Sequence, residues 1–256
     1  MKCFFMQYII DMKRACLSIR FLLCTLGVLL ILLIASSGQI EYAPDALYLF
    51  NIAVGGSGSI IMITAILPIL VYATSFAIDW ESHSTGFWMV RSGIDRYTIS
   101  KYISAGFSGF LSTGFGMTLF ILLMLLRFPL FEIITTGNAY ELFLLNNQPV
   151  LYAVYFIVHY SLSAALMTAV AFWVSTLIPN RFTTIAAPLV IYFSLFRIIQ
   201  QMALPLFLQP VYWVEGIYNA GTPSASLTVK VVIVLVLFLL MGIASVKRVR
   251  KLVQND

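Results

Sequence analysis

The chain of 256 residues is 61% hydrophobic and only 10% charged, and its mean hydropathy is +0.97. Soluble domains carry about 25% charged residues, so this composition excludes an ordinary soluble enzyme and predicts an integral membrane protein. A net charge of +5 would favour nucleic acid as a partner of a soluble protein. Here it indicates basic loops on one side of a membrane, and we expect no nucleic-acid partner.

Residues 3–20 precede the first long apolar stretch and predict a helix that lies in the inner membrane interface. Apolar residues recur there at steps of three and four, while polar residues mostly occupy the other faces. Such a helix lies along the lipid surface with its bases near anionic headgroups. An ordinary tail before the first span is the alternative.

Six apolar stretches have a length suited to transmembrane helices. They comprise residues 21–37, 58–78, 103–126, 152–177, 183–203 and 229–246. A helix rises about 1.5 Å per residue and needs about 20 residues to cross the hydrocarbon layer. Long apolar runs without a period of two favour helices over barrel strands. The predicted fold is an all-α integral membrane protein with six transmembrane helices, in one membrane domain that covers residues 1–256.

The distribution of bases predicts that both termini are cytoplasmic. Most of the 15 Lys and Arg residues fall before the first span, in the 79–102 loop, in the 178–182 turn or in the C-terminal tail. The outer half keeps only Arg127, Arg197 and Lys230. Because cytoplasmic loops retain an excess of Lys and Arg, we expect the base-rich side to face the cytosol.

The cytoplasmic loop 79–102 mixes both charge signs with aromatic residues. Gly93 divides it, so we predict two short helices joined near residues 91–95. A passive connection between two spans could be far shorter. The loop therefore indicates contact with a cytoplasmic partner.

Small residues recur along the third span, where Ser104, Ser108, Ser112 and Gly116 lie four apart. Small residues let helix backbones approach closely in a membrane. We predict packing within the chain, with a moving or dimerising contact as the alternative.

The segment 204–228 is half apolar but is interrupted by proline and glycine, so it predicts an extracellular broken or re-entrant piece. The glycine-rich run 55–59 lacks the Lys-Ser/Thr of a phosphate-binding loop. We therefore expect no ATP hydrolysis and no cofactor in this chain. The two histidines, His83 and His159, are far apart in sequence, so we expect no catalytic residue and no metal site.

Three ionisable side chains lie within or near the outer part of the spans. A charge at the bilayer centre costs at least about 2.5 kcal/mol unless it is paired or hydrated. We therefore predict that Arg197 pairs with Glu215; the alternative is that Arg197 lines a wet cavity and contacts an anionic substrate group. His159 is interpreted as a neutral side chain bonded to a neighbouring helix, or alternatively as part of a translocation path.

The passage SFAIDWESHSTGFWMVRSGIDRYTISKYIS resembles the first cytoplasmic loop of the ABC type-2 exporter permeases. Asp79 or Glu81 matches the acidic position after the second span, residues 91–96 match the turn, and Lys101 matches the lysine that opens the third span. The interfacial helix, the six spans and the broken segment before the last span also resemble that family.

The resemblance implies a permease of the bacterial plasma membrane that works as a dimer, with a second copy or a homologous permease. It also implies two separately encoded ABC ATPase subunits, which would hold ATP and Mg²⁺ and dock on the 79–102 loop. The implied docking residues are Glu81 at the acidic position, the apolar anchors Phe87, Trp88 and Tyr97, and the orienting charges Arg91, Asp95 and Arg96. The alternative is that these aromatic residues only anchor the loop in membrane lipid.

The expected function is therefore the membrane subunit of an ATP-driven exporter, with no ATPase site of its own. The apolar path suits an amphiphilic or hydrophobic cargo, such as a peptide antibiotic, a drug or a lipid-like molecule, and the family includes resistance and immunity exporters. An intramembrane protease or lipid-modifying transferase is one alternative, and it would need converging polar groups within the spans. A carrier that works without an ATPase is the other, and such carriers usually show internal repeats.

Overall fold

The computed structural model describes residues 2–55, 58–132, 137–200 and 205–255, and these parts of the chain are helical with no strand. Six helices in them are long and apolar enough to cross a membrane: Ile19–Gln39, Ser59–Glu81, Ile94–Met124, Pro149–Leu177, Arg181–Ile199 and Pro223–Gln254. The predicted fold class is confirmed. Parts of the predicted segments 55–59, 183–203 and 204–228 lie outside the described residues.

The helices follow in chain order. The first two spans and the segments around them comprise α1 (Lys2–Cys16), α2 (Ile19–Ser36), η1 (Ser37–Gln39), α3 (Ala46–Gly55), α4 (Ser59–Ile61), η2 (Met62–Ile66), α5 (Leu67–Tyr72) and α6 (Ser75–Glu81). The remainder comprises α7 (Thr85–Ser92), α8 (Ile94–Met124), α9 (Glu141–Leu145), α10 (Pro149–Leu177), α11 (Arg181–Gln200), η3 (Leu206–Leu208), α12 (Pro210–Val214) and α13 (Pro223–Asn255).

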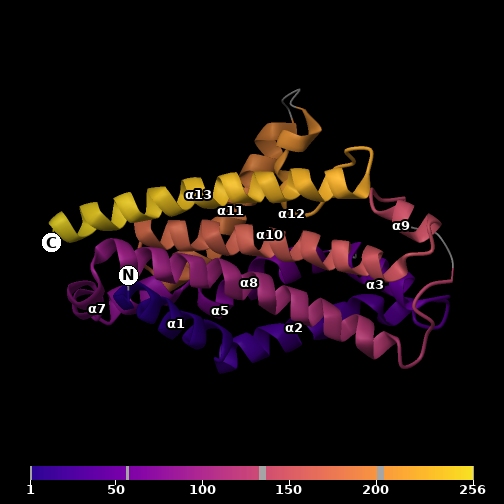
Figure 1. Ribbon diagram of the computed structural model, residues 1–256, viewed down its shortest axis with the longest axis horizontal. Coiled ribbons are helices and arrows are strands. Elements are labelled where there is room, and N and C mark those ends of the chain that lie inside the picture. Colours follow the sequence, from indigo (N-terminus) through magenta and orange to yellow (C-terminus); the bar gives the residue numbers. More distant parts are fainter. Residues whose placement is uncertain (1, 56–57, 133–136, 201–204, 256) are drawn as a thin grey trace.

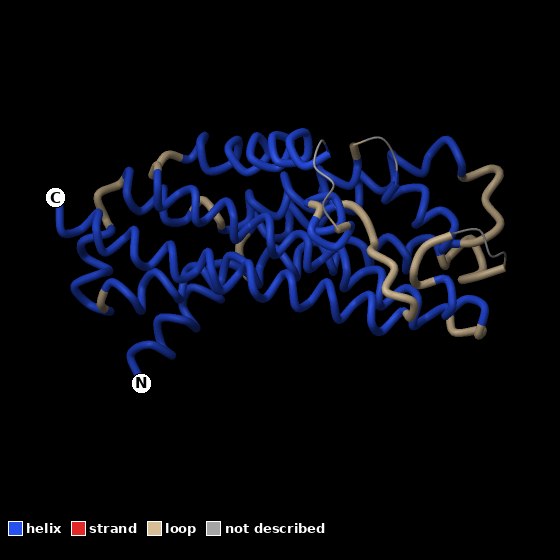
Figure 2. The backbone as a smooth tube through the Cα atoms, turned by 90° about the horizontal axis from the view of Figure 1, so that it is seen from above, coloured by secondary structure: helices blue, strands red, loops and turns tan. Residues whose placement is uncertain are grey.

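The long helices run along the longest axis of the molecule (Figure 1). Both termini and α7 lie at one end, and α3 and α9 lie at the other. The chain therefore passes between the two ends an even number of times. The view from above shows the same arrangement (Figure 2). Helices α8 and α10 form the centre, because they pack against each other and each also packs against α5 and α13.

Small residues of α8 pack against helices of the same chain. A Cβ atom added to Gly109 would lie 2.6 Å from Thr168 on α10, and one added to Gly116 would lie 2.6 Å from Val28 on α2. Ser104, Ser108 and Ser112 are fully buried. The small residues of α8 therefore serve close packing within the chain, as predicted, rather than an exposed dimer contact.

The second span contains a wide turn at residues 62–66, which precedes Pro68. Proline has no N–H to donate, so the carbonyl of Ile63, five residues earlier, receives no backbone hydrogen bond from it. The hydroxyl of Thr113 on α8 donates to the Ile63 carbonyl over 3.0 Å and replaces that partner. The irregular turn is thus satisfied inside the bundle, as a membrane requires.

Helix α1 is separated from α2 at Leu17 and Ser18, and the Ser18 hydroxyl caps α2 by accepting from the Phe21 N–H. The face of α1 that meets the bundle is polar: Gln7 and Asp11 are buried. Met6 is 68% exposed. The helix therefore has an exposed apolar surface available to lipid.

Candidate partner-docking site

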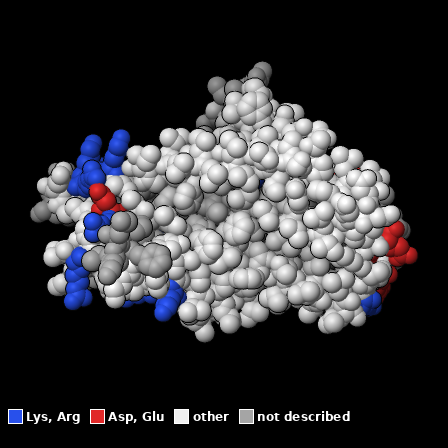
Figure 3. Space-filling view, in the orientation of Figure 1, with Lys and Arg blue, Asp and Glu red and all other residues white. Residues whose placement is uncertain are grey.

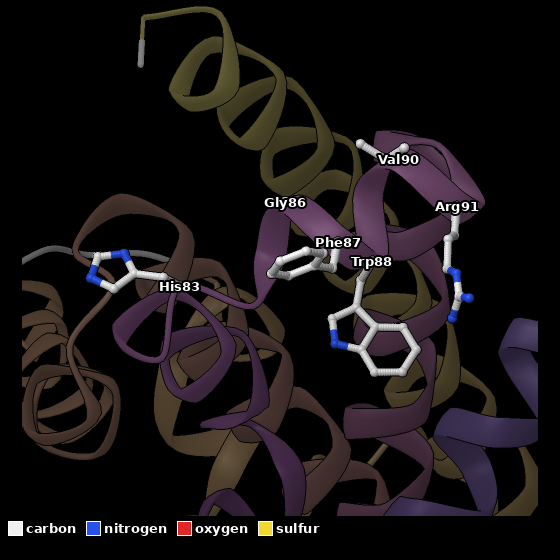
Figure 4. Close-up of a pocket in the computed structure, with 6 residues that line it drawn as sticks. All are labelled: His83, Gly86, Phe87, Trp88, Val90 and Arg91. Carbon is white, nitrogen blue, oxygen red and sulfur yellow. The ribbon is translucent and has the colours of Figure 1, made fainter.

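Helix α7 carries large apolar side chains that no part of the described chain covers. Phe87 is 78% exposed and Val90 is 88% exposed. They line a shallow hollow of about 730 Å³ together with His83, Gly86, Trp88 and Arg91. Figure 4 shows these side chains on α7 and on the turn that precedes it. An exposed apolar surface with a basic side chain at its edge is typical of a protein interface.

Tight turns at both ends hold α7 in place. Before it, the N–H of Ser84 donates to the Asp79 carbonyl over 2.9 Å, and His83 adopts a left-handed backbone conformation with φ 54°. After it, Gly93 has φ 82° and ψ 146°, and its N–H donates to the Met89 carbonyl over 2.8 Å. Met89 is buried, so the opposite face of α7 packs on the bundle.

Helix α1 also contacts α7. The guanidinium of Arg14 lies 4.8 Å from the centre of the Trp88 ring, which is a cation–π distance. Trp88 is consequently only half-buried and lies between α1 and the exposed hollow.

A buried polar cluster lies beneath this site and comprises Asp11, Tyr72, Asp79, Tyr97, Ser100 and Lys101; we term it the inner polar cluster. Lys101 is nearly fully buried, and its Nζ lies 2.9 Å from Asp79 Oδ2. Tyr97 donates to the same carboxylate over 2.7 Å. The Lys101 ammonium also lies 5.4 Å and 5.3 Å from the ring centres of Tyr72 and Tyr97. Its charge is thus compensated from several sides.

Asp11 joins α1 to this cluster. Its carboxylate accepts from Tyr72 over 2.8 Å, from Gln7 over 3.1 Å and from the Ser100 hydroxyl. Buried carboxylates are costly unless such donors surround them. The inner polar cluster therefore fixes α1, the end of the second span and the start of α8 relative to one another, and α7 stands on this support.

Most of the residues that the sequence implied for docking lie at this end of the molecule. Phe87, Arg91 and Arg96 are exposed. Asp95 accepts two hydrogen bonds from Arg250 of α13, one of them 2.6 Å long. Glu81 pairs with Arg181 of α11, with Oε2 2.6 Å from Nε.

Two expectations for the loop are corrected. Tyr97 is fully buried in the inner polar cluster, so it does not lie on the exposed face of α7. Only the first of the two expected short helices is separate, because residues 94–102 are the first turns of the long helix α8. The break at Gly93 lies where it was predicted.

The bases visible on one face of the molecule gather mainly at the end that bears α7 and the termini, and acidic side chains gather at the opposite end (Figure 3). This separation follows the charge pattern of the loops.

In the half of the molecule away from α7, His159 is buried and has partners at both ring nitrogens. Nδ1 lies 2.9 Å from the Tyr140 hydroxyl, and Nε2 lies 3.0 Å from the Gly216 carbonyl. Burial raises the pKa of Tyr140, so that hydroxyl remains a donor. The Gly216 carbonyl can only accept, so Nε2–H donates to it, and in a neutral imidazole Nδ1 then accepts from Tyr140.

The expected pair between Arg197 and Glu215 is absent from the described residues. Arg197 is exposed on α11, and the Glu215 carboxylate accepts a hydrogen bond from the Tyr192 hydroxyl instead. The segment that carries Glu215 turns back toward α10, where Tyr160 donates to the Glu215 carbonyl over 3.1 Å. Tyr192 is buried and Arg197, five residues further along α11, is exposed, so Glu215 and Arg197 lie on different faces of this helix.

Lys230 was not singled out from the sequence, where it counted only as one of the few outer bases. It is 3% exposed on α13, and its Nζ donates to the Ser163 hydroxyl over 2.8 Å, to the Tyr212 carbonyl over 3.2 Å and to the Trp213 carbonyl. Its place near the start of an otherwise apolar span was the available signal.

Comparisons with models of protein families, with curated proteins and with solved structures found no match. The geometry of the chain itself therefore carries the functional argument, and what it shows directly is a multi-pass helical membrane protein.

Proposed function

We propose that this chain is the membrane-spanning permease subunit of an ATP-driven exporter, and that a separately encoded ATPase docks on α7. The observation that carries the proposal is the exposed apolar pair Phe87 and Val90 at a base-rich end of the molecule. Lipid covers apolar side chains along the spans. Helix α7 lies outside the spans, between the second and the third, so a protein partner would be needed to cover Phe87 and Val90.

The support under α7 fits a site that transmits force. A helix held only by flexible loops would move without moving the spans. Helix α7 instead rests on Met89, contacts α1 through Trp88 and is followed directly by α8. Closure of an ATPase around ATP and Mg²⁺ would therefore reach the spans as a rigid-body movement.

The remaining parts of the proposal follow from the charge pattern and the family resemblance. The base-rich end lies in the cytosol of a bacterial cell, and a second copy or a homologous permease completes the membrane unit. The cargo is amphiphilic or hydrophobic, in keeping with spans that carry few charges.

Copurification of an ABC ATPase subunit with this chain tests the docking surface. Phe87→Ser and Val90→Ser each remove an exposed anchor, so we expect about 30-fold weaker association for the stronger of the two, which is typical of an interface hot spot. Leu126→Ser is the matched control, because Leu126 is 87% exposed at the opposite end of α8 and its loss leaves association unchanged.

A second arm tests the orienting charges. Arg91→Glu combined with Arg96→Glu reverses two exposed bases and should abolish association. Undiminished association of these variants would refute the docking site. Transport by the purified chain alone in vesicles would refute the exporter and favour a carrier.

A further inference from the structure

A groove of about 400 Å³ separates α8 from α13 at the end that bears α7 and the termini. Its walls are apolar and include Ile99 and Ile103 of α8 and Leu239 and Ile243 of α13. Ile243 is 55% exposed and Leu239 is 62% exposed, so the groove opens sideways toward the surrounding lipid.

Aromatic rings and glycines shape the floor of this groove. The Tyr102 and Phe238 rings are in contact, with centres 4.4 Å apart and planes tilted by 42°, and the Tyr102 hydroxyl donates to the Phe238 carbonyl over 2.6 Å. A Cβ atom on Gly242 would lie 2.9 Å from the Tyr102 ring, and one on Gly106 would overlap the Phe238 ring. The two glycines let the rings enter between the helices, and the floor is therefore fixed in shape.

The groove ends at basic side chains. Lys247 and Arg250 line its mouth, and Lys247 forms no ion pair within the described residues. Arg250 also borders a more polar hollow of about 720 Å³, together with Arg91 and Arg96. Asp95 is the one acidic residue among those that line the two spaces. The apolar groove thus adjoins a hollow lined by basic side chains.

Asp95 already holds Arg250 in an ion pair, so Lys247 is the unpaired base at the groove. We infer that this groove binds an anionic phospholipid of the inner leaflet, with an acyl chain against Tyr102 and Phe238 and the phosphate at Lys247. The position of the cations decides the class of occupant. A zwitterionic lipid would leave the net positive charge of the mouth unpaired, whereas a phosphate without a second charge neutralises it. Basic pockets between spans on the cytoplasmic side suit anionic headgroups for this reason.

The site does not depend on the ATPase. It requires only that the base-rich end faces the leaflet that holds anionic lipid. A failure of the docking proposal would leave this inference intact, and the reverse also holds.

The test uses the full chain in nanodiscs of phosphatidylcholine that contain a phosphatidylglycerol with a photoactivatable group in its acyl chain. Crosslinked peptides are mapped by mass spectrometry. We expect crosslinks at Ile99, Ile103, Leu239 and Ile243, and competition by unlabelled phosphatidylglycerol but not by glycerophosphate, which lacks the acyl chains. A photoactivatable phosphatidylcholine serves as the parallel probe and should label the groove several-fold less.

Two pairs of variants separate charge from shape. Lys247→Gln should lower labelling by the anionic probe about five-fold, the effect of one base near a membrane surface, whereas Lys251→Gln, one turn further along the same helix and outside the groove, should lower it less. Leu239→Trp fills the groove and should remove the crosslinks, whereas Leu240→Trp, 59% exposed and outside the groove, should keep them.

Equal labelling by the two lipids, or labelling spread evenly around α13, would overturn the inference. Size-exclusion profiles and melting temperatures establish that each variant is folded. If Leu239→Trp fails to fold, the Lys247→Gln pair still decides the outcome, because Lys247 is exposed and its replacement leaves the packing unchanged.

Discussion

The Lys230 amine is buried in the apolar part of α13, and within the described residues it has no carboxylate partner. It is surrounded instead by the Ser163 hydroxyl and by two carbonyls near the end of α12. Carbonyls in the last turn of a helix lack helical partners and carry partial negative charge. Lys230 therefore satisfies these groups and holds α12 between α10 and α13.

Replacing Lys230 by Met should release α12 without unfolding the bundle. A hydrogen bond contributes about 0.5–1.5 kcal/mol net, so we expect the loss of the two bonds to α12 to raise amide exchange in residues 210–216 about 10- to 100-fold. Hydrogen–deuterium exchange of the purified chain measures this. Lys251→Met, at an exposed position of the same helix, serves as the control, and unchanged exchange in Lys230→Met would show that α12 is held by other contacts.

For single residues, the sequence predicted that His159 forms a hydrogen bond within the protein, but it did not predict the partners. A single histidine in an apolar span must bond within the protein, and it does. The Arg197–Glu215 pair was wrong because Glu215 meets the buried face of α11 at Tyr192, whereas Arg197 lies on the exposed face of that helix. The inner polar cluster could not be predicted, because it joins residues 61 and 89 positions apart.

Among the elements, α7 depends on the backbone conformation of Gly93. With φ 82° and ψ 146°, this residue occupies a region that side chains with a Cβ atom rarely adopt. The change in direction at Gly93 ends α7 and starts α8 without an intervening loop. It therefore sets the angle at which Phe87 and Val90 are presented.

Gly93→Ala should strain this junction by about 1–3 kcal/mol and displace α7. We expect a lower melting temperature of the purified chain and faster amide exchange in residues 85–92. Gly86→Ala provides the comparison, because Gly86 lies inside α7 and a Cβ atom there meets nothing within 4 Å. That variant should be neutral or more stable by about 0.4–1 kcal/mol. Equal effects of the two substitutions would exclude a special role of the Gly93 backbone.

Apolar length predicted the positions of the spans, whereas their ends depend on tertiary contacts. Helix α8 begins at Ile94 rather than at residue 103, and α13 continues to Asn255 rather than to residue 246. The ion pair between Asp95 and Arg250 joins these two extensions beyond the apolar stretches. The hydropathy of a segment predicts which residues lie in the membrane, but it does not predict how far a helix extends beyond the membrane surface.

For the molecule as a whole, the described helices place both termini and α7 at one end. The charge pattern adds that this end carries most of the visible bases. Reversing the orientation would require these bases to be translocated across the membrane, which the insertion machinery disfavours.

Cysteine accessibility in intact cells measures this orientation. In a chain whose three cysteines are replaced by serine, Val90→Cys tests the α7 end and Tyr42→Cys tests the opposite end, and both positions are well exposed, at 88% and 79%. A membrane-impermeant maleimide should label position 42 directly and position 90 only after the cells are permeabilised. The inverse pattern would place the termini outside and remove the basis for a cytosolic ATPase.

The bond between Glu81 and Arg181 has a mechanical consequence. Glu81 closes α6 just before α7, and its carboxylate holds both the side chain and the backbone N–H of Arg181, the first residue of α11. Only 17% of the α11 span is buried, against 61% of the α10 span beside it. A partner that displaces α7 would therefore act on α11 as well as on α8, and α11 is the helix that the described chain encloses less.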